Sequence, residues 1–259
     1  MYILQYESAV LAKKAYEFYL TLDNVEYVEP DIIVRVQSDI EVPNEFVPEI
    51  IPEGSASEVF DWLSDKIGFN DIKECLKERI ADDYVLVATI DSGADIDHDL
   101  LKDRVIDSGV NMSGTGNPSS CDDDYGHGTH VAGIIVSNTL DNVKIMPYKV
   151  LNDEGKGSLS AIAVAVDMAV EDGADVINMS LTAKGESARM TEAIDNATAN
   201  NVNVVVSAGN SKTDLDKTYY TPACVESAIT VSATDKNDKL ASFSNYDGPI
   251  NIAAPGTEI

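Results

Sequence analysis

The sequence predicts an α/β fold with three layers, in which helices cover both faces of a mostly parallel central sheet. The first observation is a series of continuous apolar runs, typical of buried strands, from about residue 84 onward. The second is that segments with helical periodicity separate these runs, the pattern of parallel strands joined by helices. A chain of 259 residues with 44% hydrophobic content can bury the core of such a domain.

The predicted main domain covers residues 58–259, and its elements follow one another closely. Helical patterns come first, over residues 59–68 and 70–80. The predicted strands are residues 84–90, 143–150, 174–180, 202–208 and 228–233. The helices between them are residues 128–138, 158–173 and 187–201. This alternation predicts a sheet that is covered on both faces.

The first stretch, residues 1–36, is predicted to be a small strand–helix–strand piece. Its strands are expected in residues 2–6 and 25–36, on either side of a helix that Ser8 caps. Four apolar residues recur in the helix at helical spacing: Leu11, Ala15, Phe18 and Leu22. Three short elements form a very small core, so we expect this piece to pack on the rest of the chain.

Residues 37–57 combine three prolines with many acidic residues and show little periodicity. This composition is typical of a solvated linker, the kind of segment in which proteolysis occurs. The alternative is an ordered, strand-like arm that lies on the main domain.

The charge balance excludes some classes of partner. With 45 acidic and 18 basic residues the formal net charge is −27, which argues against binding to nucleic acid or to an anionic membrane surface. No apolar run approaches membrane-spanning length, and the N-terminus does not have the pattern of a signal peptide. The cysteines Cys75, Cys121 and Cys224 form no CxxC pair, and an odd number does not support a disulfide framework.

Polar side chains gather where the predicted strands end, which is where parallel sheets form their sites. Asp91 ends the first strand and Asn210 follows the fourth, while a histidine segment, His127 and His130, opens the first helix after the sheet begins. An aspartate in this position is often only a turn or capping residue. Paired with a histidine, however, a buried carboxylate accepts the Nδ1 proton and leaves Nε2 as a general base. A nearby side-chain amide could then donate to a developing oxyanion.

The two histidines are three residues apart, with glycine and threonine between them. The zinc-binding HExxH pattern places its histidines four apart around a glutamate, so zinc is the weaker interpretation. The acidic residues 122–124 form a charge run before a helix start, which is usually solvated and favourable to the helix dipole.

Five blocks of sequence, in this order, resemble the subtilisin-like serine peptidases. These blocks are VATIDSGADIDH, GHGTHVAGII, VINMSL, VVVSAGN and INIAAPGTEI, and the resemblance runs from about Tyr84 to the end. It implies that Asp91 is the triad aspartate, His127 the general base and Asn210 the oxyanion amide. His130 is then a packed, structural residue, and Asp123 is expected to brace the loop.

The resemblance also implies a substrate and a zymogen form. An extended polypeptide is expected to add a strand along Ser180, Leu181 and Thr182. One of its side chains is expected to fill a pocket of which Ser207, Ala208 and Gly209 form one wall. Relatives commonly have glycine at positions 182 and 183, so narrower subsites are expected here. Residues 1–36 resemble half of an inhibitory propeptide, with processing expected in residues 37–57; the alternative is an arm with no inhibitory role.

Cofactors and compartment follow from the same resemblance. No cofactor is required for the chemistry, structural calcium is common in the family, and no residue is assigned to a metal. Secretion is favoured, and a cytoplasmic location is the alternative, since acidic intracellular members exist.

The sequence lacks the nucleophile that the family carries in a Gly-Thr-Ser helix start. We therefore expect a peptidase domain that is incomplete at its C-terminus, with the serine beyond Ile259, and an inactive chain as given. The alternatives are a non-catalytic relative that binds or assists a partner peptidase, and two polypeptides that complement each other.

Overall fold

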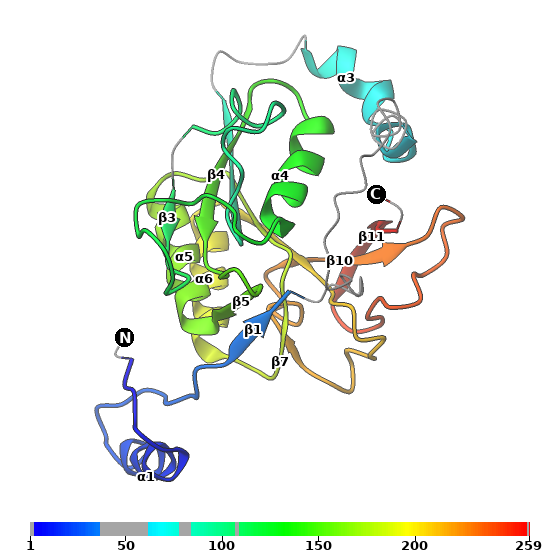
Figure 1. The fold of residues 1–259 in the computed structure, drawn as a ribbon. Coiled ribbons are helices and arrows are strands. Elements are labelled where there is room, and N and C mark those ends of the chain that lie inside the picture. Colours follow the sequence, from blue (N-terminus) through cyan, green and yellow to red (C-terminus); the bar gives the residue numbers. More distant parts are fainter. Residues whose placement is uncertain (1–2, 37–61, 78–83, 107–108, 258) are drawn as a thin grey trace.

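A sheet of seven strands, parallel throughout, runs through the centre of the protein (Figure 1). The structure is a computed structural model that describes residues 3–36, 62–77, 84–106, 109–257 and 259. The strand order is β11-β10-β8-β6-β2-β4-β3. The strands are β2 (Val85–Asp91), β3 (Val110–Asn111), β4 (Val143–Lys149), β6 (Val176–Met179), β8 (Asn203–Ser207), β10 (Ile229–Thr234) and β11 (Ile250–Pro255). The predicted parallel sheet is confirmed.

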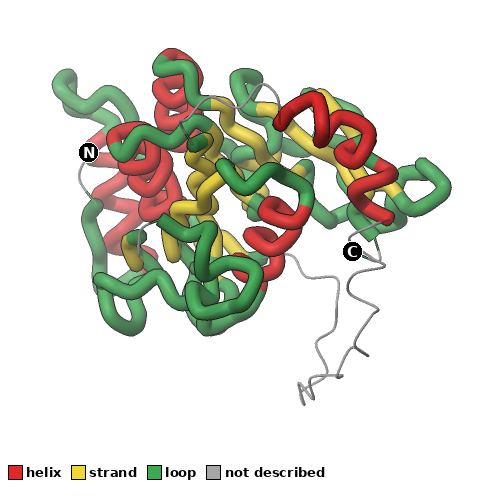
Figure 2. The backbone as a smooth tube through the Cα atoms, turned by 90° about the horizontal axis from the view of Figure 1, so that it is seen from above, coloured by secondary structure: helices red, strands yellow, loops and turns green. Residues whose placement is uncertain are grey.

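Helices lie on both sides of the sheet, as Figure 2 shows. Helix α4 (His127–Ser137) packs on one face through Ala132 and Val136. Helices α5 (Leu159–Glu171) and α6 (Ala188–Ala199) pack on the other face, and α3 (Phe69–Lys77) precedes β2 in the chain. The three-layer α/β/α architecture is therefore confirmed.

The alternation of side chains along β2 decides which residues meet which helix. Leu86, Ala88 and Ile90 belong to the core beneath α5 and α6, whereas Val87 belongs to the core beneath α4. Because successive side chains of a strand point to opposite faces, Asp91 lies on the same face as Val87. The last residue of β2 is thus directed towards the helix that begins with His127.

The N-terminal piece contains α1 (Ala9–Tyr19) and β1 (Ile33–Arg35). The predicted cap is confirmed, since the Ser8 hydroxyl accepts the Leu11 N–H at 3.3 Å. The strand predicted in residues 2–6 is wrong, because residues 3–6 are not in a strand and no strand of the described chain pairs with them. The apolar face of α1 is not buried either: Leu11 is 47% and Phe18 58% exposed.

Strand β1 joins this piece to the main domain, as expected. It pairs antiparallel with β5 (Lys156–Ser158), and Val34 in its middle is completely buried. A second small antiparallel pair, β7 (Ala183–Lys184) with β9 (Tyr220–Thr221), lies close to the same strand. The predicted linker of residues 37–57 lies outside the described residues, and the predicted domain boundaries stay predictions. None of the described helices is long and apolar enough to cross a membrane.

Candidate active site

Asp91 and His127 form a hydrogen-bonded pair at the carboxyl end of β2. Nδ1 of His127 lies 2.7 Å from Oδ1 of Asp91, and the same oxygen accepts the Ser92 N–H at 2.7 Å. Asp91 is fully buried, whereas the side chain of His127 keeps a quarter of its surface exposed. A carboxylate in this position holds the proton on Nδ1, so the free Nε2 can accept a proton.

The charges around His127 raise its pKa above the ordinary imidazole value. Burial alone would lower the pKa, but the negative charge and hydrogen bond of Asp91 outweigh it, and the charge of Asp123 adds to the effect. The second oxygen of Asp91, Oδ2, is buried and has no hydrogen-bond partner among the described residues.

Two glycines let the loop after β2 and the start of α4 approach closely. A Cβ on Gly128 would lie 2.1 Å from the carbonyl oxygen of Gly93, so no residue with a side chain fits at position 128 unless the backbone moves. The Ser92 hydroxyl accepts the Gly128 N–H at 2.9 Å. Through this contact the residue after Asp91 is bonded to the residue after His127.

Asp123 braces the entry to α4, as the family resemblance implied. Its carboxylate accepts N–H groups of Tyr125, Gly126 and Thr129 at 2.8 to 3.0 Å, and the Thr129 hydroxyl at 2.7 Å. Burial would raise the pKa of Asp123, but these hydrogen bonds outweigh it and lower the pKa. Asp122 and Asp124 are exposed, which agrees with the prediction of a solvated charge run.

His130 differs from the prediction of a packed side chain, because it is exposed on the surface of α4. Partial burial of its ring and the charge of His127 lower its pKa, against a smaller opposing effect of a hydrogen bond to the backbone of Ile259. At three residues' spacing on a helix, His130 lies on the same side of α4 as His127, which agrees with the effect of the His127 charge on it.

A cavity of about 120 Å³ brings most of the predicted site residues together. Its lining consists of His127, Ser180, Leu181, Thr182, Ser207, Gly209 and Asn210. These residues come from the ends of β6 and β8 and from the start of α4. Ala208 and Asp91 are buried and do not line the cavity.

Asn245 supports the loop that carries Asn210, and it is not among the predicted site residues. Its Nδ2 donates to the Ala208 carbonyl at 2.8 Å, and its Oδ1 accepts the N–H groups of Ser211 and Thr213 at 3.0 and 2.9 Å. The side chain is fully buried. One amide thus satisfies three backbone groups of the loop, a long-range arrangement that no local pattern in the sequence indicates.

The N-terminal strand lies along the edge of this site. Arg35 bridges Thr182 in antiparallel fashion, and the Val36 N–H donates to the Gly155 carbonyl at 3.0 Å. β1 therefore lies between β5 on one side and Thr182, in the predicted peptide-binding segment 180–182, on the other. The position expected for an extended substrate is held by a segment of the chain itself.

Two carboxylates of the N-terminal piece fix it to helix starts. Glu29 accepts the Ser187 hydroxyl at 2.7 Å and the Ala188 N–H at 2.8 Å, at the beginning of α6. Asp31 accepts the hydroxyl and N–H of Ser160, in the first turn of α5, at 2.6 and 3.0 Å. Carboxylates are favoured there because unpaired N–H groups and the helix dipole make helix starts electropositive.

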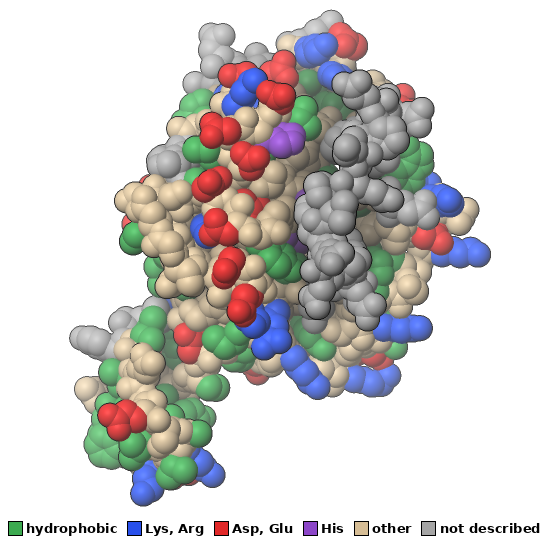
Figure 3. All heavy atoms as spheres, in the orientation of Figure 1, with side chains coloured by type: hydrophobic (Ala, Val, Ile, Leu, Met, Phe, Trp, Pro, Cys, Tyr) green, Lys and Arg blue, Asp and Glu red, His purple; other side chains and the backbone are tan. Residues whose placement is uncertain are grey.

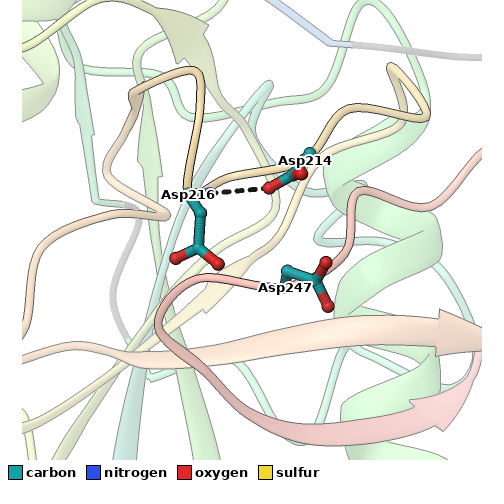
Figure 4. A group of neighbouring side chains, drawn as sticks. All are labelled: Asp214, Asp216 and Asp247. Carbon is teal, nitrogen blue, oxygen red and sulfur yellow. Dashed lines mark hydrogen bonds between the residues drawn. The ribbon is translucent and has the colours of Figure 1, made fainter.

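Three aspartates approach one another on the surface, two of them shortly after Asn210 in the chain (Figure 4). Asp214 and Asp216 belong to the loop after β8, and Asp247 belongs to the loop before β11; one oxygen of each lies within 4.8 Å of the others. Lys217 already forms an ion pair with Asp214. Oxygen ligands suit calcium, but exposed acidic groups gather often without an ion, so structural calcium stays a prediction.

Acidic side chains form a band across the face of the molecule that Figure 3 shows. This band agrees with the net charge of −27, which opposes polyanionic partners. Among the described residues, the cysteines Cys75, Cys121 and Cys224 form no disulfide.

A parallel α/β sheet with a buried Asp–His pair at its strand ends, beside a small cleft, fits the acid–base part of a serine protease site. The chain belongs to the subtilase family, whose model (Peptidase S8, subtilase family) matches residues 82–258. This membership confirms the resemblance.

Individual relatives agree with the family. The chain is 38% identical to subtilisin DY of Bacillus licheniformis over 68% of this chain and 65% of that protein. It is 35% identical to an intracellular serine protease of Paenibacillus polymyxa over 68% of this chain and 57% of that protein. The crystal structure of a lanthipeptide protease matches with a TM-score of 0.65 and 30% identity, over 77% of this chain and 62% of that one. The chain thus spans less than two thirds of each relative.

Proposed function

We propose that the protein is a serine endopeptidase of the subtilisin type, which hydrolyses peptide bonds with an Asp–His–Ser triad. The 2.7 Å contact between Asp91 and His127, in a cleft that Asn210 also lines, is the observation that carries this proposal. Asp91 and His127 are the acid and base of the triad, and Asn210 is the oxyanion donor. The attacking serine lies outside these 259 residues, because they contain no Gly-Thr-Ser sequence.

In this mechanism His127 moves each proton. Its Nε2 takes the proton of the serine hydroxyl as the oxygen attacks the peptide carbonyl, while Asp91 stabilises the imidazolium that forms. The Asn210 amide donates a hydrogen bond to the oxyanion. The imidazolium then gives its proton to the leaving amine, and an acyl-enzyme remains. Water, deprotonated by the same Nε2, hydrolyses this ester and releases the serine.

The serines of the cleft are poor candidates for the nucleophile. Ser180 and Ser207 line the cavity, but within the described residues the His127 ring is hydrogen-bonded to Asp91 and to no serine. Without an attacking serine the 259-residue chain is proposed to be inactive. The Asp91–His127 pair then supplies only the general base of the site and its orienting carboxylate.

The N-terminal piece is proposed to be part of an inhibitory propeptide. It supports this role by adding a strand beside residues 180–182, where an extended polypeptide substrate is proposed to bind. The buried Val34 and the outward Arg35 alternate as a bound peptide's side chains would. Two branched aliphatic residues in alternate positions, Val34 and Val36, face the domain core, so a substrate with similar residues is favoured.

Cofactor and location follow as proposals of the same kind. The chemistry above needs no cofactor. Secretion is the proposal that the family resemblance favours, and the cytoplasm is its alternative, because one relative is named an intracellular serine protease.

The test compares two polypeptides from the same gene. One is the 259-residue chain, and the other is extended through the first downstream Gly-Thr-Ser. Hydrolysis of an unstructured peptide is measured for both, with His127→Ala introduced into each. We expect cleavage only from the extended chain, and at least a 10³-fold loss with His127→Ala.

Two outcomes contradict the proposal. Steady cleavage by the short chain that survives His127→Ala would remove His127 from the reaction. A natural stop codon directly after Ile259, with no cleavage by any form, would instead favour a non-catalytic protein that binds a partner peptidase.

A further inference from the structure

Lys149 is a charged residue in the interior, beside the Asp91–His127 pair. It ends β4 directly opposite Asp91 on β2, and its side chain is 1% exposed. The alternation along β4 places it on the α4 face, since Met146 and Tyr148 belong to the core of the other face. An ammonium group taken out of water is costly unless it is fully paired, so its contacts need a reason.

The contacts of Lys149 connect the two loops that carry the pair. Its Nζ donates to the Ser92 carbonyl at 3.0 Å and to the Asp122 carbonyl at 2.9 Å. Ser92 directly follows Asp91, and Asp122 begins the loop that leads to His127. The third partner is the carboxylate of Asp124, at 3.1 Å, which is half exposed.

The two loops touch each other at the same place. The Ala94 N–H donates to the Cys121 carbonyl at 2.9 Å, and a Cβ on Gly93 would lie 2.2 Å from that oxygen. The two loops therefore pack too closely to accept a larger residue at Gly93, and Lys149, at the end of β4, contacts both of them.

We propose that Lys149 is a positioning residue for the Asp91–His127 pair: its ammonium holds the Ser92 and Asp122 carbonyls together and so sets the distance between the carboxylate and the imidazole. Lys149 acts through these backbone groups and does not touch the reacting atoms. The inference rests on the proposed function only in calling the pair catalytic, because the geometry it explains exists in the chain as it stands.

The alternative is that Lys149 merely stabilises the fold. The two roles predict different changes in the pKa of His127 when Lys149 is replaced. The charged groups that face this region are Asp91 from β2, Asp123 and Asp124 from the loop before α4, His130 from α4, and Lys149 itself. Loss of the Lys149 charge by itself would raise the pKa of His127. A loosened contact with Asp91 would lower it, because the carboxylate supports the imidazolium.

The experiment follows the His127 ring by NMR in the 259-residue chain, with His127→Gln used to assign its signals. In Lys149→Met we expect the pKa of His127 to fall and its Nδ1 proton to exchange with water about tenfold faster. Lys144→Met is the matched control: Lys144 lies on the same strand and donates to the Asp103 carbonyl at 2.9 Å, away from the pair. It should leave both readouts unchanged.

Further variants keep the test decisive. Urea unfolding shows whether Lys149→Met folds. If it does not, Lys149→Gln is used, which is neutral but still donates hydrogen bonds. It should lower the pKa of His127 as well, to a smaller extent. Lys149→Arg, which can donate to both carbonyls, should restore the wild-type titration. A rise or no change of the His127 pKa in the folded Met or Gln variant overturns the proposal. None of these readouts needs peptide hydrolysis, so a failure of this proposal can be told apart from a failure of the proposed function.

Discussion

His127 Nδ1 lies 2.7 Å from Asp91 Oδ1, although 36 positions separate the two residues in the sequence. The strand end and the helix start that carry them meet because Asp91 lies on the α4 face of β2. The carboxylate raises the pKa of the imidazole, and the stability of the protein must therefore depend on pH through this pair.

The first prediction is that His127 stabilises the fold more in mildly acidic than in alkaline solution. Its pKa is raised in the folded state, so the stabilisation is fully present below the pKa of the unfolded chain and is lost as the pH rises through the folded value. The difference in unfolding free energy between the wild type and His127→Gln, measured in urea, should shrink as the pH rises. Asp91→Asn should remove most of this pH dependence, because only the smaller effect of Asp123 remains; an unchanged pH dependence there would contradict the role of Asp91.

Asp123→Asn should destabilise the protein by about 1 to 2 kcal/mol at pH 7, because a carboxylate that accepts several N–H groups at a helix start is replaced. The pKa of Asp123 is lowered on folding, so its stabilisation is present above the unfolded pKa and lost as the pH falls through the folded value. The effect should therefore be smaller at pH 3. Asp122→Asn, at an exposed neighbour, should change the unfolding free energy by less than about 0.5 kcal/mol. Equal effects would contradict a bracing role.

Gly128→Ala should cost about 3 kcal/mol or more, because the new Cβ would lie 2.1 Å from the Gly93 carbonyl oxygen. Gly133→Ala in the same helix is the control. No atom lies within 4 Å of its Cβ, so helix propensity should stabilise it by about 0.5 to 1 kcal/mol. Thermal unfolding followed by circular dichroism measures both, and a tolerated alanine at position 128 would show that the two loops can separate.

Asn245→Ala should destabilise the protein by about 2 to 4 kcal/mol, since two partly buried N–H groups and the buried Ala208 carbonyl of the Asn210 loop lose this hydrogen-bond partner. Asn237→Ala, at an exposed position, should cost less than about 0.5 kcal/mol. Urea unfolding of both variants is the measurement. A cost for Asn245→Ala no larger than that of the control would mean that the loop keeps its shape without the amide.

Glu29→Ala should loosen the N-terminal piece from α6, because the Ser187 hydroxyl and the Ala188 N–H lose their acceptor. Amide hydrogen exchange at Val36 and Leu159, whose N–H groups bond between the N-terminal piece and the segment around β5, should speed up about tenfold. Glu26→Ala, an exposed carboxylate of the same piece, should leave the exchange rates unchanged. Unaltered protection in the Glu29 variant would show that β1 pairing alone holds the piece.

The sequence by itself determined the main sheet, the helices that cover it and the candidate site positions at the strand ends. Continuous apolar runs such as the one that became β2 can be read locally, because burial on both faces leaves no polar position to interrupt them. The cap at Ser8 was also readable, since capping involves residues only three apart.

Only the tertiary structure decided what surrounds the pair. Lys149 and Asn245 reach backbone groups 27 to 57 residues away, and contacts at such separation leave no mark on local periodicity. The strand predicted at the N-terminus failed for the same reason, because a strand forms only where another chain segment offers its hydrogen bonds. β1 exists because β5 and Thr182 lie beside it, and that neighbourhood is a property of the folded chain.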